Sequence, residues 1–301
     1  MKIIVLSFFI ALIIPFAAFA ADEPPILPSL DTAADARPLQ QTQSERMAQV
    51  IDDHHILLKN GRVVELTGIE IPQSTGFGAS EQAAAAGAFI KSLFEKDADS
   101  DVMLYQTPGA GKGRTNRLGH DLAHVVRKNG HIWIQGALLA NGLARARPTP
   151  DNPELAIRMM ALEDQARMAG KGLWAKDSQY RLIQATDPIE ITDQFAVVEG
   201  VVKNVSTINN VTYLNFGDDW RKDFTTGIPS AIRQAMSRNN LDVFRLQNQR
   251  VRVHGWLRAY NGPYIELEMP VLLEEVSKTA APATASETPP SSVMTEPSAN
   301  Q

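Results

Sequence analysis

Histidine and acidic side chains in the first half of the chain offer ligands for a metal ion. Imidazole and carboxylate together suit zinc, nickel or copper, whereas calcium prefers oxygen ligands alone. The candidates are Asp52, His54, His55, Glu65, Glu70, His120 and His124. His120 and His124, four apart on an expected strand, should point to one face, and His54 and His55 to opposite faces. No HxH pattern fixes a site, so solvated or hydrogen-bonded surface histidines are the alternative interpretation.

A second group of side chains is basic and could contact phosphates. Lys112, Arg114 and Arg117 lie in a Gly-rich stretch just before His120. Arg145 and Arg147 follow an expected short helix. Phosphate contacts by such residues position a nucleic acid without cleaving it. The alternative is a solvated loop whose charge nearby acids balance.

The elements that must position these side chains suit a small barrel. Residues 50–73 predict a hairpin, because Asn60-Gly61 is a strong turn signal between apolar runs and Pro72 closes the second strand. Strands are expected over 102–105 and 122–126. Helices are expected over 134–140, over 154–168 and after Ser80, whose hydroxyl can cap that helix. This order predicts a mainly β, α+β unit, a five-stranded barrel with helices packed on it.

Four sequence phrases within residues 46–175 resemble motifs of the staphylococcal-nuclease-like (thermonuclease) family. Their order and spacing are compatible with that family, which implies its barrel fold. The phrases are Gly68-Ile69-Glu70-Ile71-Pro72-Gln73, residues 115–123, residues 137–144, and residues 161–166 with Lys171-Gly172-Leu173-Trp174.

The resemblance also implies a reaction, calcium-dependent phosphodiester hydrolysis with two arginines facing the phosphate and a glutamate acting on water. At the matching positions this chain has Glu65 for the first arginine, Gln73 for the glutamate and His120 for the second arginine. Glu65 reverses a charge that must face a negative phosphate, and an amide cannot take a proton at neutral pH. We therefore expect a catalytically degenerate site rather than an active nuclease.

The metal positions that the resemblance implies are also altered. The two calcium carboxylates fall at His54 and Glu70, and a threonine ligand falls at Ile71. Asp52 lies nearby, so Asp52, His54 and Glu70 are the candidate ligands for a divalent metal, either calcium or a transition metal.

Residues 193–277 predict a second five-stranded barrel of the OB type, after a linker at 176–192. Strands are expected over 195–205, 211–217, 224–228, 251–257 and 264–267, with a helix over 230–238. OB barrels bind single strands by stacking bases on aromatic side chains. The candidates are Tyr213, Phe216, Trp220, Phe224 and Trp256 for stacking, and Arg221, Lys222, Arg252 and Arg258 for phosphates. Strand alternation sends half of these aromatics inward, and the Trp220-Arg221-Lys222 stretch is the least core-like.

Both ends of the chain predict segments outside the barrels. Residues 1–20 have the form of a Sec-type signal peptide, with Lys2, an apolar run over 3–16 and cleavage after Ala20. Residues 21–45 are expected to be a flexible leader and residues 278–301 a disordered tail. The chain has no cysteine, which excludes disulfides, thiol catalysis and Cys-based zinc sites. Its net charge of -5 over 301 residues means that any nucleic-acid binding must use a local basic patch.

The sequence therefore predicts two tandem OB-like barrels in an exported, periplasmic or secreted protein. The leading hypothesis is a degenerate nuclease-like module that binds single-stranded nucleic acid or an envelope protein. The alternatives are a metal-dependent phosphodiesterase acting on DNA or RNA at a rebuilt site and a structural envelope scaffold.

Overall fold

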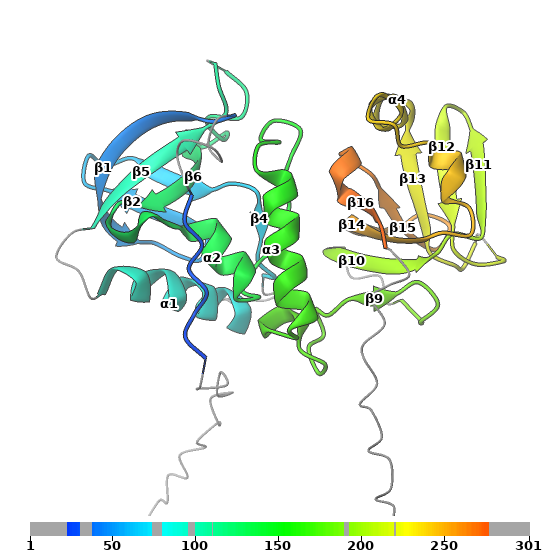
Figure 1. Cartoon of the computed structure of the whole chain (residues 1–301), viewed down its shortest axis with the longest axis horizontal. Helices are drawn as coiled ribbons and strands as arrows, with labels where there is room; N and C mark the ends of the chain where they lie inside the picture. The colour runs from blue at the N-terminus through cyan, green and yellow to red at the C-terminus, as the bar shows by residue number, and fades with distance from the viewer. Residues whose placement is uncertain are drawn as a thin grey trace, which may run out of the picture.

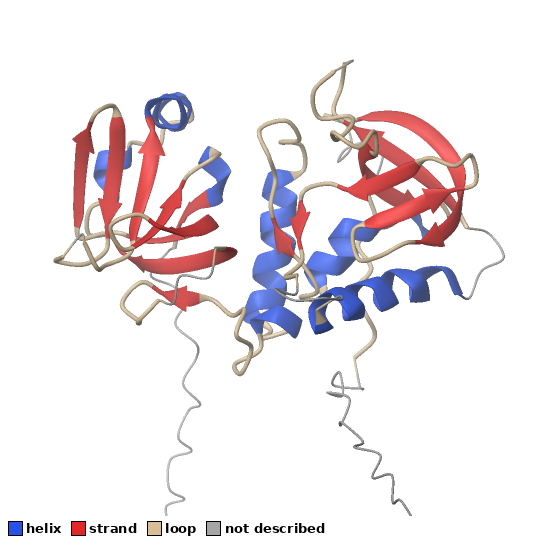
Figure 2. Ribbon diagram, turned by 180° about the vertical axis from the view of Figure 1, so that it is seen from behind, coloured by secondary structure: helices blue, strands red, loops and turns tan. Residues whose placement is uncertain are grey.

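A computed structural model describes residues 23–30, 38–73, 80–95, 100–109, 111–189, 193–219 and 221–276. The expected signal peptide and tail lie outside the described residues. Two barrels lie side by side along the long axis of the molecule, and α3 (Ala156–Met168) stands between them (Figures 1 and 2). No helix among the described residues is long and apolar enough to cross a membrane.

Five strands close the first barrel, which confirms the fold expected from the sequence. A long strand, β1, pairs with β2 and β5, β2 pairs with β3, and β5 pairs with β6. The parallel pair of β3 and β6 closes the ring. The strands are β1 (Gln40–Val50), β2 (His55–Leu58), β3 (Val63–Leu66), β5 (Asp101–Gln106) and β6 (Asp121–Arg127).

The leader predicted for residues 21–45 is wrong where β1 begins, because this strand starts at Gln40. The sequence of β1 did not predict a strand because most of its side chains are polar and only Met47 and Val50 are buried. Residues 23–30 also lie against the barrel: Leu30 is buried, and the carbonyl of Pro28 accepts a hydrogen bond from the Trp133 backbone N–H at 2.9 Å.

The helices of the first unit pack on one end of the barrel. The expected cap is confirmed, since Ser80 Oγ accepts the Ala83 N–H at 2.9 Å before α1 (Glu81–Glu95). Every residue of α2 (Ile134–Ala140) is buried. The third helix begins at Ala156 and not at residue 154, because Leu155 adopts a left-handed φ of 62°. Short strands complete the unit: β4 (Ile69–Glu70) pairs with β8 (Arg145–Ala146), and β7 (Ile132–Trp133) pairs antiparallel with the end of β6.

The second barrel repeats the OB order, with a break in its first strand. The sequence predicted one strand over 195–205, but the structure splits it into β10 and β11 around Val202. These halves pair with β14 and β12 at the two ends, and the parallel pair of β13 and β15 lies between. The elements are β10 (Gln194–Val201), β11 (Asn204–Ile208), β12 (Val211–Asn215), β13 (Thr225–Pro229), α4 (Ser230–Arg238), β14 (Arg250–Ala259) and β15 (Pro263–Glu266).

Short elements complete the chain. Strand β9 (Ile183–Gln184) pairs with β10, and β16 (Leu273–Glu275) pairs with β14. The 3-10 helices are η1 (Asn129–His131), η2 (Gly172–Trp174), η3 (Val243–Leu246) and η4 (Pro270–Leu272).

Buried polar contacts join the two barrels through α3. Glu163 accepts the backbone N–H of Ala146 and lies 2.7 Å from His254 Nε2 on β14, so one carboxylate contacts both units. Arg252 pairs with Asp164 at 2.9 Å and with Glu199 at 3.0 Å. Removing one partner of a buried ion pair leaves an uncompensated charge, which is strongly destabilising, so these pairs favour one packing of the two units.

Candidate functional site

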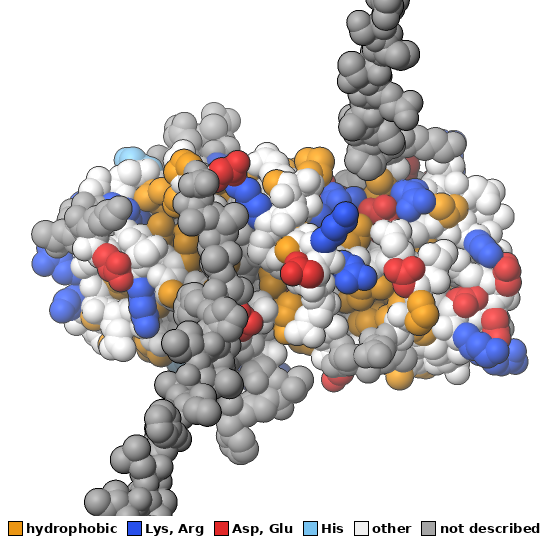
Figure 3. All heavy atoms as spheres, turned by 90° about the horizontal axis from the view of Figure 1, so that it is seen from below, with side chains coloured by type: hydrophobic (Ala, Val, Ile, Leu, Met, Phe, Trp, Pro, Cys, Tyr) orange, Lys and Arg blue, Asp and Glu red, His pale blue; other side chains and the backbone are white. Residues whose placement is uncertain are grey.

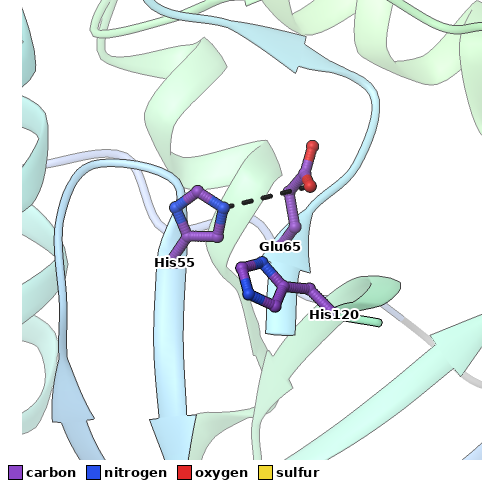
Figure 4. Close-up of side chains that lie close together, drawn as sticks. All are labelled: His55, Glu65 and His120. Carbon is purple, nitrogen blue, oxygen red and sulfur yellow. Dashed lines mark ion pairs between the residues drawn. The ribbon is translucent and has the colours of Figure 1, made fainter. Parts of the chain in front are cut away.

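Three potential metal ligands converge at one end of the first barrel. His55 opens β2 and stands opposite Glu65 of β3 in the strand register. His120 immediately precedes Asp121, which pairs with Val64, while Glu65 pairs with Leu122, so the parallel ladder places His120 within two residues of Glu65. One ligand atom from each side chain lies within 4.8 Å of the others, and all three side chains are half-buried (Figure 4).

Surrounding hydrogen bonds orient two of these side chains. The Asp52 carboxylate lies 2.9 and 3.0 Å from His55 Nδ1 and accepts the backbone N–H groups of His54 and His55. This leaves Nε2 of His55 directed at Glu65, with 3.9 Å between Nε2 and Oε2. Asn116 donates from Nδ2 to Glu65 Oε2 at 2.7 Å. The polar partners therefore hold the imidazole and the carboxylate face to face.

His120 completes the cluster and is itself held by Asn116. The Asn116 Oδ1 accepts the His120 backbone N–H at 3.0 Å, which fixes the loop before β6. The His120 ring meets the His55 ring edge-on at a centroid distance of 5.3 Å. Its Nδ1 is buried and has no hydrogen-bond partner among the described residues. A buried nitrogen without a partner is costly unless something else binds it.

His124 does not join this cluster, although it lies only four residues after His120. Its ring is buried against Trp133 at 5.6 Å between centroids. Burial lowers the pKa of His124 to about 3, so the imidazole stays neutral in the folded protein.

The metal set expected from the sequence, Asp52, His54 and Glu70, does not converge. Asp52 orients His55, whereas His54 pairs with Asp53 at 2.8 Å between Nδ1 and Oδ2. Burial opposes the charge on His54, but the hydrogen bond and charge of Asp53 outweigh it and raise the His54 pKa. Glu70 pairs with Arg147 at 2.9 Å. Because adjacent residues of this turn point in different directions, the spacing in the sequence did not show which of His54 and His55 would face Glu65.

The positions that the resemblance assigns to calcium do not fit that ion. Glu70 is paired with an arginine, Ile71 is fully buried, and His54 offers a nitrogen where calcium requires oxygen. Gln73, at the position of the catalytic glutamate, donates from Nε2 to Asp53 at 2.7 Å and to the Ile71 carbonyl at 3.1 Å. An amide used as a donor cannot act as a general base.

Two of the expected phosphate-binding arginines are structural. Arg145 is buried and donates to the carbonyls of Phe195 and Tyr180, so the prediction that it contacts nucleic acid was wrong. Arg147 pairs with Glu70 and lies over the Trp256 ring of the second barrel at 5.2 Å. Neither role could be read from the sequence, because both depend on the second barrel packing against the first.

The remaining cations that the sequence predicted for phosphate binding in the first barrel lie in its loop between β5 and β6. Lys112 and Arg117 are exposed, as expected for a solvated loop. Arg114 donates from Nε to the Thr107 carbonyl at 2.9 Å and also bonds Gln40, so it braces the loop. Two exposed cations do not form a phosphate-binding surface by themselves.

Most aromatic candidates of the second barrel are also structural. Phe216 and Phe224 are buried in its core, and Trp256 packs edge-on against Phe195. Arg252 is buried in the ionic contacts with α3, so the sequence interpretation of it as a phosphate ligand was wrong. Trp220 lies outside the described residues. Arg221 is exposed, and Lys222 is exposed and pairs with Asp219 at 3.5 Å.

A tyrosine cluster on the second barrel contains one residue that the sequence indicated, Tyr213, and two that it did not, Tyr260 and Tyr264. Tyr213 projects from β12 between buried neighbours, and the Tyr260 and Tyr264 rings lie 5.1 Å apart. Burial, the charge of Glu266 and the nearby Tyr213 all raise the pKa of Tyr264. A Cβ at Gly227 would lie 1.9 Å from Tyr264 Oη, so only glycine lets this ring lie across β13. The alternation of β12 and this glycine were the signals available in the sequence.

The closed five-stranded sheet defines the class of the first domain, an OB-like barrel. Residues 63–176 match the family model described as staphylococcal nuclease homologue. The chain therefore carries a staphylococcal-nuclease-homologue domain, as its motifs indicated. The match starts at β3, whereas the barrel itself starts at β1. No curated protein sequence matches the chain.

Proposed function

We propose that this is an exported nuclease-like protein that binds single-stranded nucleic acid and does not hydrolyse it by the family's mechanism. The observation that supports this most strongly is the Glu65 carboxylate, which faces His55 and His120 where the resemblance requires an arginine. A unit charge 4 Å from a phosphate contributes about 4 kcal/mol at an effective dielectric of about 20. Reversing its sign replaces that attraction by repulsion.

The position of the general base supports the same conclusion. The Gln73 amide donates hydrogen bonds to the Asp53 carboxylate and the Ile71 carbonyl. Asp53, the carboxylate beside it, is also paired with His54. Burial opposes its charge, yet the bonds to His54 and Gln73 leave the pKa of Asp53 lowered, which makes it a weaker base.

Binding is proposed to use the tyrosine cluster of the second barrel, in which Tyr260 is exposed, Tyr213 is half-buried, and the buried Tyr264 packs against Tyr260. OB barrels bind oligonucleotides on this strand face and its loops, where bases stack on aromatic rings. Arg258 stands opposite Tyr264 in the register, and the turn at Gly262 lies against the backbone of Lys222. Glu266 at 3.4 Å from the Tyr264 hydroxyl disfavours phosphates there, so base stacking would carry the interaction.

Charge distribution supports a local contact rather than a broad electrostatic one. Positive and negative side chains are interspersed over the face seen in Figure 3. With a net charge of -5, we expect modest affinity and a shallow salt dependence.

Export is proposed from the amino-terminal segment. Lys2, the apolar run at 3–16 and the Ala18-Phe19-Ala20 pattern form a signal-peptide sequence, which would release a chain starting at Ala21 to the periplasm or the medium.

The test is incubation of purified residues 21–301 with single-stranded DNA and RNA, with calcium, zinc, manganese or chelator, followed by gel analysis of products and complexes. We expect intact substrate and a shifted complex that Tyr260→Ala weakens about tenfold, in line with about 1–3 kcal/mol per stacked base. Phe244→Ala, at another exposed aromatic, is the matched control and should bind normally. Cutting in calcium would refute the loss of the family mechanism, and no shift would refute nucleic-acid binding.

A metal-dependent phosphodiesterase is the second candidate function, favoured by the convergence of His55, Glu65 and His120. Cutting that requires zinc or manganese and disappears in His120→Ala would establish it in place of the binding role.

A further inference from the structure

We propose that His55, Glu65 and His120 form a binding site for a transition-metal dication of the zinc class. This site is not the family's calcium site, because it uses different residues and nitrogen ligands. It is independent of nucleic-acid binding and of hydrolysis, so either can fail while the metal site stands.

The backbone brings the three ligands together before any ion is bound. His55 and Glu65 are opposite each other on paired strands, and His120 comes from the loop that leads into the strand parallel to β3 (Figure 4). Ligands from three paired segments need little rearrangement, which reduces the entropy lost on binding. The site is thus preorganised by the ladder that closes the barrel.

The distances suit a small dication. Zinc binds imidazole nitrogen and carboxylate oxygen at about 2.0–2.2 Å, so neighbouring ligand atoms in a tetrahedral site lie roughly 3.4 Å apart. His55 Nε2 and Glu65 Oε2 are 3.9 Å apart, and the three ligand atoms lie within 4.8 Å of one another. Side-chain movements of about an ångström would bring these atoms to the separation of a tetrahedral site, and half-buried side chains can move that far.

Outer contacts match those of known metal ligands. Metal-binding histidines commonly donate their second ring N–H to a carboxylate. Here His55 Nδ1 lies 2.9 Å from the Asp52 carboxylate, which would accept that hydrogen bond. The ligating carboxylate is itself hydrogen-bonded, here by Asn116. These contacts fix the tautomer with Nε2 of His55 free to coordinate.

The unpartnered nitrogen of His120 is the independent observation. Its Nδ1 is buried and has no hydrogen-bond partner among the described residues, although its ring faces His55. Coordination would satisfy a nitrogen of this ring. Two imidazoles and a carboxylate suit zinc, iron(II), nickel or copper and disfavour calcium. Three protein ligands also leave a coordination position open to water or an anionic ligand.

The test is metal binding by untagged residues 21–301, stripped with chelator and then titrated with zinc against a chromophoric chelator. Elemental analysis after dialysis gives the stoichiometry, and cobalt substitution gives an absorption spectrum that reports coordination. We expect one zinc per chain, no competition by calcium, and a melting temperature that rises with zinc.

Glu65→Gln and His120→Ala should each weaken zinc binding more than about 100-fold, beyond the 10–100-fold typical of outer partners, which Asp52→Asn should show. The matched control is His131→Asn, since His131 is exposed, has a left-handed φ of 50° that asparagine tolerates, and should bind zinc normally. Circular dichroism checks that each variant is folded.

Two results would overturn the proposal. One is a folded wild-type chain that binds neither zinc nor cobalt at micromolar concentrations. The other is zinc binding that Glu65→Gln and His120→Ala leave unchanged. The gel assay distinguishes the outcomes. Bound zinc with a shifted but intact substrate supports both proposals, whereas zinc-dependent cutting refutes only the non-hydrolytic function.

Discussion

Replacing Arg145 by methionine should destabilise the whole chain, because this side chain clamps three segments together. The guanidinium donates to the carbonyls of Phe195 and Tyr180 and lies over the Trp174 ring at 5.8 Å. It is buried, and burial lowers its pKa to about 10 despite the nearby charges of Glu163 and Glu70. Methionine keeps most of the volume and removes every donor.

The magnitude follows from those two bonds. A hydrogen bond from a charged donor contributes about 1.5–3 kcal/mol, so losing two costs about 3–6 kcal/mol. Removing a buried charge also relieves its desolvation penalty, which offsets part of that loss. We expect a net loss of about 3 kcal/mol, or about 6–12 °C in melting temperature for a chain of this size.

The assay is urea unfolding followed by tryptophan fluorescence, with thermal melting by circular dichroism. Arg117→Met, at an exposed loop arginine, is the matched control and should change stability by less than about 0.5 kcal/mol. A loss below about 1 kcal/mol for Arg145→Met, together with loss of nucleic-acid binding, would refute the structural role and restore the one expected from the sequence.

Three further predictions concern the first barrel. Burial holds the pKa of His124 near 3 against an ordinary value of 6.5, so the unfolded chain binds a proton at this residue before the folded chain does as the pH falls. Urea unfolding should therefore show the free energy of unfolding dropping by up to about 1.4 kcal/mol per pH unit below 6.5. His124→Phe should remove this slope. Gly142→Ala should cost at least about 2–3 kcal/mol in the same assay, because its φ is +67° and a Cβ would lie 2.2 Å from the Lys171 carbonyl; no loss would contradict this close approach. The His54 imidazole should titrate above 6.5 by NMR and move down in Asp53→Asn; because its pKa is raised on folding, the pair's stabilisation is complete below 6.5 and is lost as the pH rises through the raised pKa.

Local signals were sufficient for much of the fold. The Asn60-Gly61 turn, the Ser80 cap and the alternation of β12 all gave elements where the structure has them. The first strand, β1, was missed because its buried residues are few and its remaining side chains are polar. A strand that is stabilised by pairing rather than by its own apolar face leaves little trace in the sequence.

The candidate site was less accessible, because it depends on register and on the second barrel. The sequence identified the right residue types but placed His54 and Glu70 in the metal set, whereas the register selects His55 and Glu65. The contact of Arg147 with Trp256 of the second barrel joins residues more than a hundred positions apart along the chain. Long-range packing of this kind has no local periodicity from which to predict it.

The amino-terminal segment at residues 23–30 has a consequence for the order in which the chain folds. The Ile26 N–H bonds to Asn141 across 115 residues, and the Ser29 carbonyl bonds to Arg158 across 129. Contacts this distant slow folding, because a long loop must close before they form. Residues 26 and 29 therefore cannot dock until the chain has been synthesised as far as Asn141 and Arg158. Until then its backbone groups at these positions have to hydrogen-bond to water, and the surface of the first unit that it covers stays exposed.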